Sequence, residues 1–249
     1  MSFAPVGRTP SSAADALVGL CECFAKPVTV HNSPNTALRI RGYHKVMQIV
    51  VRYPESKTPV RMLSEEGMTD DEFYDFCQAN PYLRIERSAR GEITITPGTG
   101  GETGYRNADL TSQLVVWAKA DGRGVAFDSS TEFKLPSGAV RMADAAWVER
   151  ARLASLTREQ KRKFPPICPD FVVELTSPSD RLPEVQEKMS EWMENGARLG
   201  WLIDTDARTV YIYRPGLAVE KLIGPGKLVG EGPVGGFVLD LAVIWDPVL

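Results

Sequence analysis

Two acidic residues stand alone inside apolar stretches of this chain. Asp144 interrupts the segment MADAAWV, and Glu174 interrupts the segment FVVEL about thirty residues later. Phe, Val and Leu run through FVVEL without polar alternation, which predicts a strand buried on both faces. A carboxylate in such a strand is destabilising unless a cation or hydrogen-bond donor compensates for it. Each acid therefore needs a partner.

A metal ion is one candidate partner for the two acids. If the two strands are neighbours, both carboxylates converge at one end of a sheet, and two acids with water at the remaining positions commonly hold Mg²⁺. An ion there would lower the pKa of a bound water, orient that water and stabilise charge on a phosphoryl oxygen. The residues leave equally open a structural ion pair between Glu174 and an Arg or Lys.

Lys188 is a third group that could take part. It borders the buried face of a helix predicted over residues 182–198, whose apolar side carries Leu182, Val185, Met189, Trp192 and Met193. Its long stem could reach back to the strand ends, where an ammonium would steady an attacking water or a phosphate charge. The alternative is that Lys188 extends from the apolar edge of the helix into solvent.

A basic run lies between the two acidic strands in the sequence. It consists of Arg152, Arg158, Lys161, Arg162 and Lys163. If the run contacts backbone phosphates, it predicts nucleic-acid binding that is independent of base sequence and sensitive to salt. The alternative is a solvated loop or helix face, as most charge runs are.

Strands and helices must position these residues, and their order indicates an α/β or α+β fold. The Thr69–Glu72 segment is a capping box that predicts a helix ending at Asn80-Pro81. A glycine-rich connector is predicted over residues 98–104, because the run lacks the Lys-Ser/Thr ending of a phosphate-binding loop. Further helices are predicted over 107–120 and 182–198, and strands over 45–52, 82–88, 91–97, 124–128, 131–135, 140–148, 199–204 and 210–213.

Composition limits the class of protein. The chain has 249 residues, of which 43% are hydrophobic, so it can bury one good core. We expect an N-terminal extension, partly irregular, over residues 1–60 and one compact domain over residues 61–249. No apolar run approaches a membrane span, and the N-terminus lacks the continuous apolar region of a signal peptide. With four scattered cysteines, this favours a reducing cytoplasm.

Several segments together resemble a known family. Arg141–Trp147, Pro169–Ser179, Lys188 and Asn195–Asp204 resemble, in this order, the Uma-type family of restriction endonucleases within the PD-(D/E)XK nuclease superfamily. The resemblance covers about Met68 to Tyr213. It implies a restriction-endonuclease-like core, a mixed sheet flanked by helices, and divalent-metal hydrolysis of phosphodiester bonds with Mg²⁺ or Mn²⁺ as the metal.

The resemblance also implies roles for four residues. Asp144 matches the first metal-binding acid of the family and Glu174 the second. Lys188 matches a lysine that has moved onto the helix, because Thr176 stands where the usual lysine would follow the Glu. Glu86 matches an upstream acid that often assists the site. The expected partner is DNA, with a homodimer left open and no membrane partner.

The sequence departs from the family pattern at two places. Ala143 replaces the Pro that usually precedes the first acid, and Tyr105-Arg-Asn stands where the family often has a His. His31 and His44, the two histidines of the sequence, fall in the predicted extension, so a histidine-based metal site is not expected. Two functional classes follow: an active metal-dependent DNA endonuclease, and a non-catalytic nucleic-acid-binding or protein-interaction module that keeps the nuclease fold.

Overall fold

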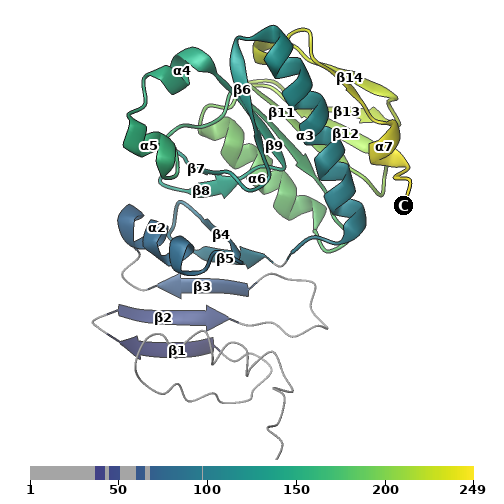
Figure 1. Cartoon of the computed structure of the whole chain (residues 1–249). Coiled ribbons are helices and arrows are strands. Elements are labelled where there is room, and N and C mark those ends of the chain that lie inside the picture. The colour runs from purple at the N-terminus through teal and green to yellow at the C-terminus, as the bar shows by residue number, and fades with distance from the viewer. Residues whose placement is uncertain (1–36, 43–44, 51–59, 65–67, 97) are drawn as a thin grey trace, which may run out of the picture.

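A computed structural model describes residues 37–42, 45–50, 60–64, 68–96 and 98–249 of the chain (Figure 1). Most of the predicted extension over residues 1–60, together with His31 and His44, lies outside these residues. The described part of that segment includes a strand at Lys45–Val50, close to the strand predicted over 45–52. The boundary between an extension and a compact domain stays a prediction.

The described strands form two large sheets and a small hairpin. The first sheet has the order β1-β2-β3-β5-β4-β8-β7, the second has the order β13-β12-β11-β10-β9-β6, and β14 pairs with β15. The strands are β1 (Ala37–Gly42), β2 (Lys45–Val50), β3 (Val60–Ser64), β4 (Arg84–Arg87), β5 (Ile93–Thr96), β6 (Gly124–Asp128), β7 (Glu132–Lys134), β8 (Val140–Met142), β9 (Ala145–Glu149), β10 (Phe171–Leu175), β11 (Leu199–Asp204), β12 (Thr209–Tyr213), β13 (Glu220–Ile223), β14 (Lys227–Val229) and β15 (Val238–Asp240).

Helices cover both faces of the second sheet (Figure 1). The helices are α2 (Asp70–Ala79), α3 (Gly101–Asp121), α4 (Arg150–Ala154), α5 (Arg158–Arg162), α6 (Leu182–Glu194), α7 (Ala242–Trp245) and a short 3-10 turn at Gly232–Val234. Leu110 and Leu114 of α3 share one buried cluster with Phe171 and Val173. Met189 and Trp192 of α6 share another with Val172, which points to the opposite face.

Strand β10 is therefore central, as the FVVEL pattern predicted. All five of its residues are buried, and it pairs antiparallel with β9 and parallel with β11. Parallel and antiparallel neighbours together make the sheet mixed. The predicted α+β class, with a mixed sheet flanked by helices, is confirmed.

Three predicted boundaries are wrong. The strand predicted over 140–148 is two strands, β8 and β9, which belong to different sheets because the chain passes from one sheet to the other at Ala143-Asp144. Helix α3 begins at Gly101, so half of the predicted glycine connector is its first turn. Helix α6 ends at Glu194, because Asn195 caps it and Gly196 takes a positive φ of 108°.

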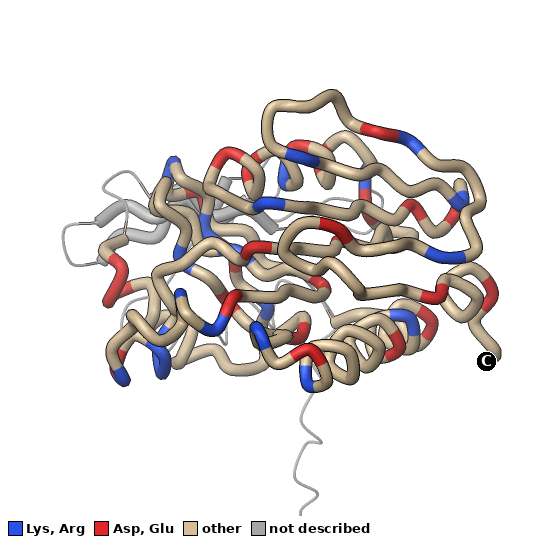
Figure 2. The backbone as a smooth tube through the Cα atoms, turned by 90° about the horizontal axis from the view of Figure 1, so that it is seen from above, with Lys and Arg blue, Asp and Glu red and all other residues tan. Residues whose placement is uncertain are grey.

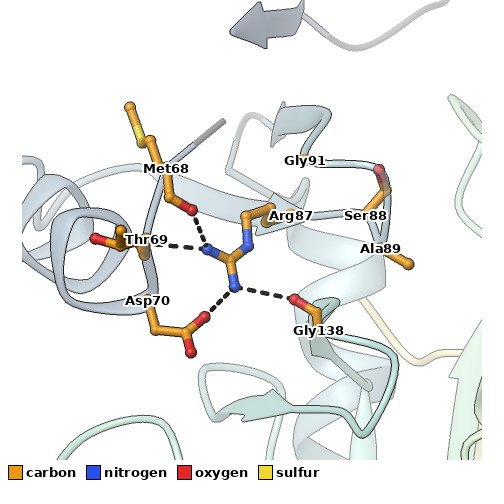
Figure 3. Close-up of a pocket in the computed structure, with 8 residues that line it drawn as sticks. All are labelled: Met68, Thr69, Asp70, Arg87, Ser88, Ala89, Gly91 and Gly138. Atoms are coloured by element: carbon orange, nitrogen blue, oxygen red, sulfur yellow. Dashed lines mark hydrogen bonds and ion pairs between the residues drawn. The ribbon is translucent and has the colours of Figure 1, made fainter. Parts of the chain in front are cut away.

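Arg87 joins three segments at the start of the compact part of the chain (Figure 3). Its guanidinium donates to the backbone oxygens of Met68, Thr69 and Gly138 and pairs with Asp70 at the start of α2. The side chain is buried and lies over the ring of Phe73. Arg87 lines a pocket of about 430 Å³ between these segments. Its contacts are structural, because they fix α2 against β4 and the turn before β8.

The surface gives little indication of a partner by charge alone. Lys and Arg are interspersed with Asp and Glu along the described backbone (Figure 2), in keeping with a net charge of −3. None of the helices in the described ranges combines the length and the apolar composition that a membrane crossing needs.

Candidate active site

Asp144 lies at the point where the chain leaves one sheet for the other. Its Oδ2 accepts a hydrogen bond from the backbone N–H of Leu175 at 2.8 Å, and its Oδ1 accepts one from Nδ2 of Asn107 at 3.0 Å. The Leu175 bond ties Asp144 to the end of β10, beside Glu174. The two acidic segments are therefore neighbours, and β9 pairs with β10, which meets the condition set by the sequence for convergence of the two acids. Burial raises the pKa of Asp144, although the Leu175 amide and the charge on Lys188 oppose the rise.

Glu174 points from β10 toward helix α6. Its carboxylate accepts a hydrogen bond from Nε1 of Trp192 at 2.9 Å and lies 3.1 Å from Nζ of Lys188. The ion pair that the sequence left open is therefore present. Burial raises the pKa of Glu174 to about 7, and the negative charges of Asp144 and Glu86 add to the rise while Lys188 opposes it. The carboxyl is thus poised to change protonation state near neutral pH.

Lys188 reaches back from α6 to the strand ends instead of extending into solvent. Its Nζ donates to the backbone oxygen of Met142 at 2.6 Å and lies 3.3 Å from Oε1 of Glu86. Only 22% of the side chain is exposed. Burial alone would lower the pKa of Lys188, but the charges of Glu174, Glu86 and Asp144 outweigh it and raise the pKa above the ordinary lysine value. Lys188 therefore stays protonated.

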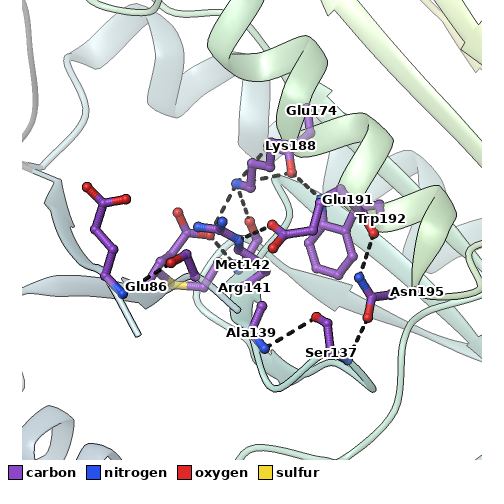
Figure 4. A network of polar contacts seen from close by, with 12 residues as sticks. Glu86, Ser137, Ala139, Arg141, Met142, Glu174, Lys188, Glu191, Trp192 and Asn195 are labelled. Carbon is purple, nitrogen blue, oxygen red and sulfur yellow. Dashed lines mark hydrogen bonds and ion pairs between the residues drawn. The ribbon is translucent and has the colours of Figure 1, made fainter. Parts of the chain in front are cut away.

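Glu86, on strand β4, completes the group from the first sheet (Figure 4). Its Oε1 accepts a hydrogen bond from the backbone N–H of Met142 at 2.8 Å. Burial works to raise its pKa, but Lys188, Arg141 and the Met142 amide together lower it, so this acid is ionised. The backbone of Met142 thus contacts Glu86 through its N–H and Lys188 through its carbonyl.

One cleft contains all four residues. Its volume is about 1200 Å³, and Glu86, Asp144, Glu174 and Lys188 all line it. Arg84, Arg90 and Arg181 also line its walls. The cleft lies between the ends of β4, β8 and β10 and the side of α6.

The basic run lies elsewhere. Arg152, Arg158, Lys161, Arg162 and Lys163 belong to α4, α5 and the residue after α5, and none of them is among the described residues that line the cleft. Arg152 donates to the buried carboxylate of Asp170 at 2.7 Å, and Lys163 pairs with Asp71 at 3.0 Å. At least these two cations have structural partners, and phosphate contact by the run stays a prediction.

Some residues of the site were not assigned a role from the sequence. For Asn107 the sequence indicated only the start of a helix, and for Trp192 it indicated only a place on the apolar face of α6. Neither pattern indicated a contact with an acid of the site. Arg141, which pairs with Glu191, lay inside a quoted motif without a role. These partners come from segments distant in the sequence, so only the fold brings them together.

Some groups of this cleft could hold a divalent cation. Three carboxylates, Glu86, Asp144 and Glu174, gather around the ammonium of Lys188. Arg141 adds a second positive charge beside Glu86, which it shares with Glu191. Each oxygen of Asp144 accepts one hydrogen bond and so keeps a lone pair that an ion can use. In the described ranges no three His, Cys, Asp or Glu side chains come together in a metal-binding geometry. An ion would therefore take Asp144 and Glu174 plus other oxygen donors.

Comparisons with known proteins agree with the fold and with the family resemblance. The family model described as "Putative restriction endonuclease", of the Uma type, matches residues 70–242. A solved structure with the same fold is that of a protein from Anabaena variabilis described as a "putative nuclease". It is 22% identical, has a TM-score of 0.60, and the match covers 72% of this chain and 97% of that chain. A search of curated proteins found no match.

The family match covers Glu86, Asp144, Glu174 and Lys188 and spans more than half of the chain. The resemblance drawn from the sequence motifs is therefore confirmed. This chain belongs to the Uma-type family described as "Putative restriction endonuclease".

Proposed function

We propose that this protein is a divalent-metal-dependent endonuclease that hydrolyses phosphodiester bonds of DNA. The observation that carries the proposal is the convergence of Glu86, Asp144, Glu174 and Lys188 in one cleft. A purely structural core has no need for three carboxylates around one lysine, and perturbed acids in a cleft indicate a functional site. Membership of a nuclease family supports a nucleic-acid substrate.

Asp144 and Glu174 are the residues that would hold Mg²⁺ or Mn²⁺. Both lie at strand ends, both line the cleft, and the bond from the Leu175 amide to Asp144 fixes them side by side. A bound ion would supply a water of lowered pKa and would stabilise negative charge on the phosphate. The backbone amide and the Trp192 indole hold the two carboxylates in place, which reduces the cost of organising the site.

Lys188 acts as a fixed positive charge. Because its pKa is raised, it cannot take a proton from the attacking water at neutral pH, but its positive charge can stabilise negative charge on that water or on a phosphate oxygen. Glu86 and the Met142 carbonyl hold the ammonium from the side of the first sheet. Glu86 is thus a positioning residue in this scheme.

One observation favours the second candidate function, a non-catalytic module that keeps the fold. Both oxygens of Asp144 have donors, and Glu174 and Glu86 share Lys188, so each of these charged side chains has a partner without an ion. The two candidate functions differ in whether a metal ion affects the activity of the protein.

A plasmid-cleavage assay separates the two. Supercoiled DNA is incubated with the protein in Mg²⁺, in Mn²⁺ and in chelator, and conversion to open-circular and linear forms is measured. We expect cleavage only with metal, and its loss in Asp144→Asn and Glu174→Gln. Glu187→Gln is the matched control, because Glu187 lines the same cleft but is exposed.

The possible results each decide something. Cleavage that survives Asp144→Asn and Glu174→Gln would refute the assigned site. Absence of cleavage together with metal-independent DNA binding would favour the non-catalytic module. A parallel RNA substrate tests the choice of DNA, since preferential RNA cleavage would replace that part of the proposal.

A further inference from the structure

We propose that Asn107 is a third oxygen ligand of the metal, acting through its side-chain amide oxygen. The inference rests on the proposed metal-dependent function and adds a residue to its site. It starts from the ligand set, because Asp144 and Glu174 leave positions around an ion that prefers six oxygens, and a neighbouring side-chain oxygen can take one of them in place of water. In the described part of the chain, no further acid completes a metal-binding group with them.

Helix α3 holds Asn107 beside the acids. The neighbouring Arg106 donates from Nε to the backbone oxygen of Ile244 at 2.8 Å, which fixes the start of the helix against the C-terminal segment. Asn107 itself is only 7% exposed. Its Nδ2 lies 3.0 Å from Oδ1 of Asp144, so the amide faces the carboxylate directly.

The amide oxygen of Asn107 has no partner. Oδ1 is buried and accepts no hydrogen bond, one of few such side-chain atoms among the described residues. Buried polar atoms are nearly always paired, so an orphaned oxygen beside a carboxylate cluster indicates a ligand or water that completes it. An apolar side chain of similar size could fill the same position without this cost.

The Asn107 amide can serve Asp144 and an ion at the same time. Its Nδ2 keeps the 3.0 Å hydrogen bond to Oδ1 of Asp144, which holds the side chain in place. Its Oδ1, at the other end of the amide, accepts no hydrogen bond and keeps its lone pairs for an ion.

Asn107 therefore has a role in each state. Without metal, its N–H donates to Asp144 and compensates part of the carboxylate charge. With metal, its oxygen would join Asp144 and Glu174 around the ion, and water would fill the remaining positions.

The test measures metal binding and not cleavage. Thermal unfolding of the full chain is followed at increasing Mg²⁺, and separately Mn²⁺, without nucleic acid, for the wild type, Asn107→Ala and Asn107→Asp. We expect Asn107→Ala to raise the half-maximal metal concentration by about tenfold or more. Asn107→Asp keeps an oxygen and adds charge, so it should lower that concentration while lowering the melting temperature in chelator.

Gln113→Ala is the matched control on the same helix. Gln113 forms hydrogen bonds with the backbone of Asp240 through both ends of its amide. None of these bonds involves Glu86, Asp144, Glu174 or Lys188. The Gln113→Ala variant should have a lower melting temperature in chelator but an unchanged half-maximal metal concentration. A loss of general stability is thereby separated from a loss of a ligand.

Three outcomes would overturn the inference. If Asn107→Ala binds metal like the wild type while Asp144→Ala does not bind, Asn107 is not a ligand and the proposed function stands. If the wild type shows no metal-dependent stabilisation, both fall together. If Asn107→Ala fails to fold, Asn107→Asp decides, because an unchanged half-maximal concentration there would exclude the ligand role.

Discussion

The position of the Lys188 ammonium depends on contacts with several other parts of the chain. The ammonium contacts Glu174 on β10, Glu86 on β4 and the carbonyl of Met142 at the end of β8. Three strands from two sheets thus meet at one atom. The apolar spacing on the helix indicated that Lys188 borders a buried face, but it could not indicate which acids it meets, because Glu86 lies about a hundred residues away.

Replacement of Lys188 separates turnover from metal binding. We expect Lys188→Ala to lower the cleavage rate by orders of magnitude, because the charge that faces the water and the phosphate is lost, with metal affinity nearly unchanged. Lys188→Arg should rescue poorly, since a planar fork does not replace a compact ammonium. Single-turnover cleavage at saturating metal measures the effect. Full activity in Lys188→Ala would return this residue to a structural role.

Glu132 predicts a pH dependence of stability outside the proposed metal site. Burial, with the charge of Glu86, raises its pKa from 4.5 to about 8. The unfolded chain therefore loses this proton at lower pH than the folded protein, and the free energy of unfolding falls as the pH rises between these two values. Glu132→Gln should remove this loss and stabilise the protein by about 1–3 kcal/mol above pH 8.

Denaturant unfolding at several pH values checks the Glu132 prediction. Glu194→Gln, the same chemical change at an exposed position of α6, is the control and should show no such pH dependence. A Glu132→Gln protein that gains nothing in stability between pH 5 and pH 8 would contradict the prediction.

At the scale of elements, two glycines allow close packing on opposite sides of the second sheet. A Cβ added at Gly124 in β6 would lie 2.1 Å from ring carbons of Trp147. A Cβ at Gly200 in β11 would meet the terminal methyl of Met189 at 2.4 Å. A buried indole cannot move aside, whereas the end of a methionine side chain can.

The two alanine variants should therefore differ in their free energy of unfolding. We expect Gly124→Ala to destabilise the protein by about 1–3 kcal/mol through overpacking, and Gly200→Ala to cost less than about 1 kcal/mol. Urea unfolding of both variants is the measurement. Equal losses would mean that Trp147 adjusts as readily as Met189.

The sequence predicted most elements and missed where the chain changes sheet. Alternation and apolar runs predicted β4, β5, β6, β10 and β11 because burial of a strand leaves a local pattern. The break at Asp144 left no such pattern, since Met142 and Ala145 are buried on either side of it. The early start of α3 was missed because glycine disfavours helix locally, while the Arg106 bond to Ile244 is a tertiary contact.

At the scale of the whole molecule, two sets of cations are candidates for the proposed DNA-binding surface. Arg90 and Arg181 are exposed and line the cleft that holds Asp144, whereas Arg158, Lys161 and Arg162 lie on α5, outside it. We expect the double change Arg90→Ala and Arg181→Ala to weaken DNA binding for all sequences and to flatten the salt dependence, with a slope change of about one per lost contact.

Salt titration of DNA affinity, with metal replaced by Ca²⁺, checks both sets. The triple change of Arg158, Lys161 and Arg162 to Ala has the larger loss of charge, so a general electrostatic effect would make it the stronger. A flattened slope in the triple variant would support the prediction made from the sequence, and an unchanged slope would exclude that run from the interface.

The crossing of the chain between two sheets at Asp144 also bears on when the protein becomes active. The groups of the site come from β4, α3, the β8–β9 junction, β10 and α6, so contacts between residues far apart in sequence must form first. Such contacts form slowly during folding. A partly synthesised or misfolded chain would hold its acids apart, and the ability to cut nucleic acid would arise only with the finished fold.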